Sequence, residues 1–368
     1  MRIVDVNPFF YPFAGGIEHR MHDECRLLAE RGHEAIVLTG RLPGTAEEEE
    51  RDGYRIIRLK SRLLRVYNPP FISSKGVLEA LESLDADVVN YNYRWAPSYN
   101  GDLGRYDGAK VFTYHNMWGE GAGLQGRLSE WSDERFGRLL DTFDHIIAVS
   151  DHVRGDLVRR GYGESDVTTV QTGLSSFPER GSGDGGFILS LGRLVKTKGL
   201  GFLIEAMREV DCRLIVCGKG PEEKRLARMI SDLGLGDRVE MRGWVSEEEK
   251  AELMGSCLFF AMPSLFESFG LAAVEAMSHG RPLVYADVNG LGDTVGGGGV
   301  AVPPGDPGAM AAAMNALLED PGYREGLAGG AFAQARRYEW GPLIDRLESV
   351  LERAASGELT MSRPGRRR

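Results

Sequence analysis

Apolar and polar residues along the chain alternate in blocks that are typical of a parallel-sheet protein. Short uninterrupted apolar runs, such as residues 258–262 and 283–285, indicate strands that are buried on both faces. Amphipathic stretches such as residues 19–31 separate these runs and indicate helices. Strands that alternate with helices in this order predict an α/β fold with doubly wound sheets.

The same pattern occurs in two halves, separated at residues 175–186 by a stretch that is rich in glycine and contains Pro178. A chain of 368 residues is long enough for two domains with full cores. We expect a first domain over 1–177, a linker over 178–186, a second domain over 187–340, a terminal helix over 341–355 that packs on the first domain, and a disordered basic tail over 356–368.

Composition narrows the class of protein. The formal net charge of -10 argues against a nucleic-acid partner, which would favour a basic surface. Apolar runs stay well below the roughly 20 residues that cross a bilayer, and the N-terminal residues begin a strand rather than a signal peptide. Four scattered cysteines without a C-x-x-C pair indicate buried thiols in a reducing compartment, so we expect a cytoplasmic protein.

Two polar stretches of the first half have less specific interpretations. The acidic residues 45–52 predict a solvated connection. Residues 60–66 interleave basic and apolar side chains, a pattern that suits docking on anionic lipid headgroups at the inner membrane face. An ordinary strand edge and loop would give the same pattern, so both interpretations stay open.

The stretch that follows the strand at 258–262 carries the most informative chemistry. Ser268 is a candidate N-cap for a helix that starts near Leu271. A loop at the carboxyl end of a strand, leading into a helix start, is an anion site. We therefore expect the backbone N–H groups of Phe269, Gly270 and Leu271 to hold phosphate.

Two glutamates flank this helix start. Glu275 lies among small and apolar residues, where a carboxylate costs several kcal/mol unless it has a partner. The hydroxyl groups of a ligand would partner it, and Glu267 could accept hydrogen bonds from a sugar in the same way. A capping acid and a salt-bridged helix acid are the alternative interpretation of the pair.

Other candidates also follow the carboxyl ends of predicted strands, where open α/β sheets bind ligands. Gly16 belongs to a Gly-Gly pair after the first strand, and His115 follows the strand at 111–114. Arg193 and Lys198 follow the strand at 187–191, and two cations at one turn indicate a bound anion. Each of these signals is weak alone, because turns, buried histidines and surface lysines are common.

Several of these stretches together resemble a known family. Residues 266–277, with Glu267 and Glu275 eight positions apart, are similar to the E-x7-E signature of the family 4 retaining glycosyltransferases. G-G-x-E at 15–18, G-R-x4-K-G at 192–199 and G-x-G-P at 218–221 match in the same order. The turn at 171–175 keeps only the glycine of the family's P-N-G-[VI]-D, and Asp293 replaces a usual glutamate. The resemblance implies the GT-B fold, in which two Rossmann-like domains face a central cleft.

For the second domain, the resemblance implies a role for each matched residue. Arg193 and Lys198 would hold the donor diphosphate, Glu267 the transferred sugar and Glu275 the ribose. Val245 would contact the nucleobase through its backbone. Neither a metal nor a cofactor is expected, because these cations and the helix start would neutralise the diphosphate.

For the first domain, the resemblance places Gly16 near the donor phosphates and the acceptor, and His115 near the reacting carbon of the sugar. It implies transfer of a hexose, with retention, from a nucleotide diphosphate sugar to a hydroxyl acceptor: a glycan, a lipid-linked molecule or a small molecule. A nucleotide-sugar 2-epimerase, a phosphorolytic enzyme and a non-catalytic sugar-nucleotide-binding subunit are the alternatives. The sequence does not choose between UDP, GDP and ADP donors.

Overall fold

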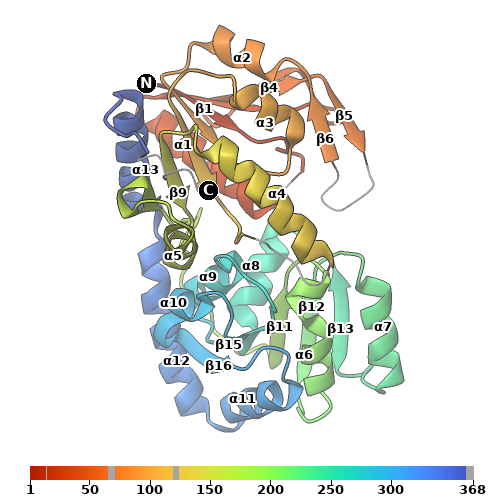
Figure 1. Ribbon diagram of the computed structural model, residues 1–368. Helices are drawn as coiled ribbons and strands as arrows, with labels where there is room; N and C mark the ends of the chain where they lie inside the picture. Colours follow the sequence, from red (N-terminus) through yellow and green to blue (C-terminus); the bar gives the residue numbers. More distant parts are fainter. Residues whose placement is uncertain (14, 65–70, 119–123, 362–368) are drawn as a thin grey trace. The chain divides into compact units, whose positions relative to one another are not determined.

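The computed structural model describes residues 1–13, 15–64, 71–118 and 124–361, and it divides into two compact units (Figure 1). Unit 1 consists of Met1–Gly173 and Trp340–Arg368, and unit 2 of Leu174–Glu339. The chain thus enters unit 2 at Leu174, and the stretch 178–186, which we expected to be a linker, lies inside that unit. Part of the basic segment at 60–66 and most of the expected tail lie outside the described residues.

Unit 1 is built on a sheet with the strand order β10-β9-β8-β7-β1-β2-β4-β3, parallel except for the β3–β4 pair. Its strands are β1 (Arg2–Val6), β2 (Glu34–Gly40), β3 (Glu48–Arg51), β4 (Tyr54–Leu59), β7 (Val88–Tyr91), β8 (Lys110–Tyr114), β9 (His145–Ala148) and β10 (Val167–Thr169). The stretch 45–52 is largely exposed to solvent, as expected, but residues 48–51 form the edge strand β3, which we did not predict. All four residues of β3 are charged, so it shows no apolar alternation.

Helices cover this sheet, and the last one of the chain belongs to it. The helices of unit 1 are α1 (Gly16–Glu30), α2 (Val77–Leu84), α3 (Pro97–Leu103), α4 (Leu124–Leu140), α5 (Asp151–Arg159) and α13 (Trp340–Ala355), and β5 (Ser61–Leu64) pairs with β6 (Phe71–Ser74) in a hairpin. In α13, Leu343, Leu347 and Leu351 recur every four residues and pack in one cluster with Ile3 and Val88. The C-terminal helix therefore completes the core of unit 1.

Unit 2 contains a wholly parallel sheet with the order β13-β12-β11-β14-β15-β16. Its strands are β11 (Phe187–Leu191), β12 (Arg213–Cys217), β13 (Val239–Gly243), β14 (Phe259–Met262), β15 (Leu283–Ala286) and β16 (Gly299–Val302). Counted within the unit this order is 3-2-1-4-5-6, the Rossmann arrangement. The residues of β14 are all buried, as their continuous apolar run predicts.

The helices of unit 2 include one that the sequence pattern did not reveal. They are α6 (Leu200–Ala206), α7 (Glu223–Asp232), α8 (Glu247–Ser256), α9 (Leu271–Ser278), α10 (Leu291–Val295), α11 (Pro307–Glu319) and α12 (Pro321–Ala335). We did not predict α12, whose three glycines after Gly322 obscure its pattern. One of them, Gly330, allows close packing, since a Cβ there would lie 2.5 Å from the carbonyl oxygen of Gly297.

The strand order identifies where each sheet would bind a ligand. Among the parallel strands, each order reverses its direction once, between β1 and β7 in unit 1 and between β11 and β14 in unit 2. In open α/β sheets, ligands bind outside the carboxyl ends of the strands at such a switch point.

Within the described part of the chain, no helix is both long and apolar enough to cross a membrane.

Candidate functional site

In unit 2, the loops after β11 and β14 are packed together at the switch point. The N–H of Leu265 donates a hydrogen bond of 2.8 Å to the carbonyl oxygen of Thr197. Gly199 has a positive φ of +62°, and a Cβ on it would lie 2.0 Å from the carbonyl oxygen of Pro263. Only glycine combines that backbone conformation with so close an approach. The two loops that carry the predicted residues are therefore fixed relative to each other.

The loops after β12 and β13 continue the same edge of the sheet. The N–H of Gly218 donates to the carbonyl oxygen of Gly243 at 2.6 Å, and that of Leu194 donates to the carbonyl oxygen of Lys219 at 2.9 Å. A Cβ on Gly218 would lie 1.9 Å from the carbonyl oxygen of Gly192. The glycines of the G-R-x4-K-G and G-x-G-P stretches thus serve close packing of neighbouring loops.

Lys198 and Glu267, which we predicted separately, meet at this switch point. The Lys198 ammonium group donates a hydrogen bond to Oε1 of Glu267, and the Ser264 hydroxyl donates to the same oxygen at 2.8 Å. The Glu267 side chain is only 10% exposed, so these two donors compensate a carboxylate that has lost most of its water. The site therefore presents a lysine–glutamate pair, not two independent charges.

The start of α9 lies in the same loop, but its cap differs from our expectation. Gly270, with a φ of 85°, is the N-cap residue, and the helix begins at Leu271. The prediction that Ser268 caps the helix was wrong, because the chain turns into the helix two residues later through the left-handed glycine. The N–H group of Ala273 donates to the carbonyl oxygen of Gly270 at 2.8 Å, so it is the N–H groups of Leu271 and Ala272, which have no carbonyl group one turn back, that an anion could bind. Phe269 anchors the loop by packing its ring edge-on against Tyr338, with 5.4 Å between centroids.

Glu275, on the following turn of α9, has a protein partner. The Lys250 ammonium group on α8 lies 2.9 Å from Oε1 of Glu275 and 2.6 Å from Oε2 of Glu247. Burial lowers the pKa of Lys250, but the two carboxylates outweigh burial and the net pKa is raised. The salt-bridged interpretation therefore describes Glu275 in this structure. Its side chain keeps 24% of its exposure, which leaves an oxygen accessible to a ligand.

The remaining predicted residues of unit 2 lie on the same edge. Arg193 opens the turn after β11 and is exposed, and its guanidinium makes no ion pair with any described residue. Val245 is buried in the loop after β13, beside Trp244, which is 68% exposed. The structure thus places the predicted residues of unit 2 on the loops that follow its strands and on α9, at the carboxyl edge of the sheet.

In unit 1, the Gly-Gly loop after β1 is supported by Glu18, a residue for which the sequence predicted no role. Gly16 is the first residue of α1, and Gly15 is its N-cap. The buried Glu18 folds back toward this loop: its Oε1 accepts a hydrogen bond of 3.2 Å from Asn7, and a Cβ on Gly15 would lie 2.7 Å from its Oε2. Glu18 therefore supports the loop from the first turn of the helix.

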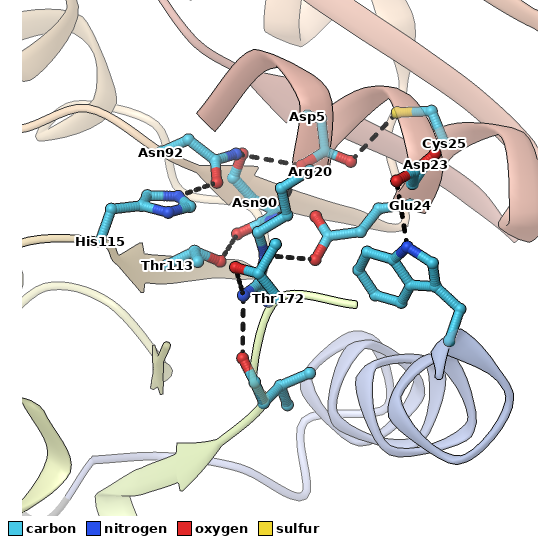
Figure 2. A network of polar contacts seen from close by, with 12 residues as sticks. Asp5, Arg20, Asp23, Glu24, Cys25, Asn90, Asn92, Thr113, His115 and Thr172 are labelled. Carbon is cyan, nitrogen blue, oxygen red and sulfur yellow. Dashed lines mark hydrogen bonds and ion pairs between the residues drawn. The ribbon is translucent and has the colours of Figure 1, made fainter. Parts of the chain in front are cut away.

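His115 follows β8 and belongs to a chain of polar contacts that crosses three neighbouring strands (Figure 2). Its Nε2 lies 2.8 Å from Oδ1 of Asn92, which follows β7. The side-chain amides of Asn92 and Asn90 donate to Oδ1 of Asp5 on β1 at 3.1 and 2.7 Å. Thr113 on β8 donates to Oδ1 of Asn90 at 2.7 Å. The histidine is thus held by side chains of the β1–β7 switch point.

These contacts determine which nitrogen of the imidazole carries the proton. An ionised Asp5 can only accept, so the Asn92 amide donates to it and the Asn92 oxygen faces His115. That oxygen can only accept, so His115 donates from Nε2, and its Nδ1, for which the described residues provide no hydrogen-bond partner, is an acceptor. Burial, and secondarily the positive charge of Arg20, lower the pKa of His115 well below its usual value. The ring is therefore neutral and offers a hydrogen-bond acceptor to a ligand.

A buried group of charges lies behind this chain. Arg20 donates to Glu24 at 2.7 Å, and the side chains of both are fully buried. Burial raises the pKa of Asp5 to about 6 and that of Glu24 to about 7, although Arg20 opposes both shifts. Arg20 also donates to the carbonyl oxygen of Val170 at 2.9 Å, which ties α1 to the end of β10. These groups support the histidine from within the core.

Sequence reasoning missed four residues that hold the site residues in place, namely Asp5, Glu18, Asn92 and Lys250. Asp5 did give a signal, since it is a carboxylate inside an apolar strand. Lys250 gave no such signal, because lysines are common on the polar face of a helix. Among the described residues, no group of three or more His, Cys, Asp and Glu side chains is arranged to hold a metal ion.

Comparison with known proteins assigns the chain to a family. Residues 14–175 match Glycosyltransferase Family 4, and residues 175–332 match Glycosyl transferases group 1. The chain is a family 4 glycosyltransferase. This confirms the resemblance drawn from its motifs, and it makes the chain an enzyme of the glycosyltransferase class.

Individual relatives cover nearly all of this glycosyltransferase. The phosphatidyl-myo-inositol mannosyltransferase of Mycobacterium leprae is 29% identical over 97% of this chain and 98% of its own. Sucrose-phosphate synthase from Thermosynechococcus elongatus has a similar structure, with a TM-score of 0.82 and 21% identity over 97% and 99% of the two chains. Anabaena HepE, solved in complex with UDP-glucose, has a TM-score of 0.79 and 19% identity over 96% and 99%. The predicted GT-B fold is confirmed.

Proposed function

We propose that this glycosyltransferase moves a hexose from a nucleotide diphosphate sugar to a hydroxyl acceptor and retains the configuration at the anomeric carbon. The observation that carries this proposal is the arrangement at the β11–β14 switch point. There the Lys198–Glu267 pair, one more cation at Arg193 and the free start of α9 share one edge of a Rossmann sheet. Such an edge suits a ligand with a diphosphate next to hydroxyl groups.

In the reaction, the bond between the sugar and the diphosphate breaks and negative charge grows on the leaving group. Arg193, Lys198 and the amides at Gly270 and Leu271 stabilise that charge. Because these groups supply positive charge at one edge of the sheet, we propose that transfer does not depend on a metal ion. Glu267, positioned by Ser264, accepts hydrogen bonds from the transferred sugar.

Further residues orient the donor in this proposal. Glu275 accepts hydrogen bonds from the ribose hydroxyl groups while it keeps its ion pair with Lys250. Val245 contacts the base through its backbone, and Gly16 lets the phosphates approach the start of α1. His115 accepts a hydroxyl hydrogen of the sugar at Nδ1, because its Nε2 is committed to Asn92.

The class of donor and acceptor is inferred by analogy with the similar proteins. HepE was solved with UDP-glucose, and the M. leprae relative is named for a lipid acceptor. We propose a nucleotide diphosphate hexose as the donor. The proposed acceptor carries a hydroxyl group, and lipid-linked molecules are one class of such acceptors. With a lipid-linked acceptor, the enzyme would work in the cytoplasm at the inner face of the membrane.

Donor binding is tested by thermal unfolding in the presence of UDP-, GDP- and ADP-hexoses. One of them should raise the Tm of the wild type, and Glu275→Ala should abolish that rise. Glu252→Ala, at an exposed position of the neighbouring helix α8, is the matched control and should keep it. An unchanged rise in Glu275→Ala would contradict the assignment of the ribose site.

The reaction itself is tested with the donor identified in this way. NMR of the product should show a new glycosidic bond with the anomeric configuration of the donor, and EDTA should leave the rate unchanged. Epimerised donor without transfer would indicate a 2-epimerase, and turnover that requires free phosphate would indicate a phosphorolytic enzyme. Binding without any product would indicate a non-catalytic subunit.

A further inference from the structure

Unit 2 contains a cavity of about 410 Å³ at the opposite edge of its sheet from the candidate site. Leu258 immediately precedes β14 and Arg281 lies just before β15, so the cavity is at the amino ends of these strands. A four-residue strand such as β14 separates the two edges by about 13 Å. The volume lies within the range of about 300–1,000 Å³ that small-molecule pockets occupy. The cavity is therefore distinct from the switch point.

The guanidinium of Arg281 is buried in the wall of this cavity and has only neutral partners. Its Nε donates to the carbonyl oxygen of His279 at 3.1 Å, its Nη1 to that of Cys257 at 3.0 Å and its Nη2 to that of Gly181 at 2.6 Å. In the part of the chain that the structure describes, no carboxylate forms an ion pair with it. The carbonyl groups orient the guanidinium but leave its positive charge without a counter-ion.

Two more arginines line the same cavity. Arg180 pairs with Glu325 at 2.8 Å, whereas Arg324 donates to the carbonyl oxygen of Leu317 at 2.5 Å. The wall thus holds three guanidinium groups and one carboxylate, a surplus of two positive charges in a chain whose net charge is -10. Burial lowers the pKa of Arg281, and the charges of Arg180 and Arg324 lower it further. Positive charge is concentrated here without matching acid.

The backbone around the cavity is shaped to accommodate this arrangement. Gly183 has a positive φ of +65°, and a Cβ on it would lie 1.8 Å from Nη1 of Arg281. Only a glycine lets the chain pass over the guanidinium at this point. Pro321, Arg324 and Ala328 line the cavity from one face of the first turns of α12, whose start is capped by the side chain of Asp320.

We propose that this arginine cavity, formed by Arg180, Arg281, Arg324 and Glu325, is a second anion site that binds the phosphate group of a small phosphorylated molecule. A phosphate dianion matches the surplus of two positive charges, and guanidinium groups bind its oxygens in a bidentate fashion. The cavity has room for more than the phosphate alone, so a phosphorylated sugar or a similar metabolite fits better than the free ion. A bound ligand would tie residues 180–183 to α12.

The test is calorimetric titration of the full chain with inorganic phosphate and with glucose 6-phosphate, at constant ionic strength. We expect one saturable site, with tighter binding of the phosphorylated sugar. Arg180→Gln or Arg324→Gln should weaken binding by about tenfold or more, since each removes a charged hydrogen-bond donor. Arg208→Gln, at an exposed position of the same unit, is the matched control and should bind like the wild type. Glu325→Gln should strengthen binding because it removes the only carboxylate of the wall.

Two further measurements separate this site from the candidate donor site. Lys198→Gln should keep the binding of glucose 6-phosphate, and Arg324→Gln should keep the Tm rise that a nucleotide sugar produces. The proposal is overturned if neither probe binds saturably, if Arg180→Gln and Arg324→Gln bind like the wild type, or if Lys198→Gln abolishes binding. Arg281→Gln is not used, because loss of its three carbonyl contacts would disturb folding itself.

Discussion

Replacement of Asp5 by asparagine tests the buried negative charge that accepts the hydrogen bonds of Asn90 and Asn92 in unit 1. Oδ1 of Asp5 accepts hydrogen bonds from Asn90 and Asn92, and Cys25 donates to Oδ2 at 3.4 Å. Asparagine has the same shape, and its carboxamide oxygen can accept both amide hydrogens while its NH2 group faces the sulfur. Asp5→Asn therefore removes a buried negative charge and keeps the two strand-to-strand hydrogen bonds.

The magnitude follows from the pKa of the carboxyl group. Burial raises the pKa of Asp5 from 3.8 to about 6, against the hydrogen bonds from Asn92, Cys25 and Asn90. A shift of this size costs about 3 kcal/mol of unfolding free energy once the group is ionised in both states. Below the unfolded pKa both states are protonated and nothing is lost. Between the two pKa values the folded state alone keeps the proton, so stability falls as pH rises, and above the folded pKa the loss is constant.

The assay is urea unfolding of the wild type and Asp5→Asn, followed by tryptophan fluorescence. Four of the five tryptophans lie in unit 1, so the signal reports mainly on that unit. The stability of the variant relative to the wild type should rise by about 2 kcal/mol between about pH 4.5 and pH 7.5. Asp107→Asn, at an exposed position, should show no such rise. If the two proteins lose stability in parallel over this range, Asp5 is not the buried charge inferred here.

Three other substitutions test the positioning of the site. Asn92→Ala removes the acceptor that fixes His115 and should lower kcat by roughly tenfold to a hundredfold; an unchanged kcat would show that the histidine needs no such support. Gly199→Ala forces a Cβ against a facing carbonyl group and should lower the unfolding free energy by roughly 1–3 kcal/mol in urea titrations, so full stability would contradict the loop packing. Lys250→Met leaves Glu275 without its ammonium partner. This substitution should lower the unfolding free energy by roughly 1–3 kcal/mol, a value between those of an exposed and a buried ion pair. It should also raise the Kd of the donor. An equal Kd for the wild type and the variant would argue against coupling between the Lys250–Glu275 pair and donor binding.

Much of the fold could be predicted because buried parallel strands have a simple signature. The continuous apolar run at 258–262 indicated a central strand, and β14 lies there with all its residues buried. The missed elements lack that signature for physical reasons. The edge strand β3 is largely exposed to solvent, and all four of its residues are charged. In α12, glycines interrupt the amphipathic pattern, and one of them, Gly330, lies where the backbone of Gly297 approaches closely.

For the candidate site, strand ends could be predicted but pairings could not. Parallel strands bring their carboxyl ends to one edge, so Lys198 and Glu267 were expected on the same edge of the sheet. Lys198 and Glu267 are 69 residues apart in the chain, and their contact depends on the loop packing at Gly199. The same holds for His115 and Asn92, which follow different strands. Contacts between distant loops are tertiary information that no local periodicity contains.

The two switch points differ in how they could bind a charged donor. In unit 2, a cation is already compensated by Glu267, so a bound diphosphate would compete with that carboxylate for Lys198. The cost of breaking the pair would be repaid if the freed carboxylate then accepted hydroxyl groups of the sugar. In unit 1, the neutral His115 carries no charge to compensate and can offer only an acceptor. Recognition of phosphate would therefore depend on unit 2, and unit 1 would contribute orientation, which is why Asn92→Ala is expected to act on kcat and Lys250→Met on donor affinity.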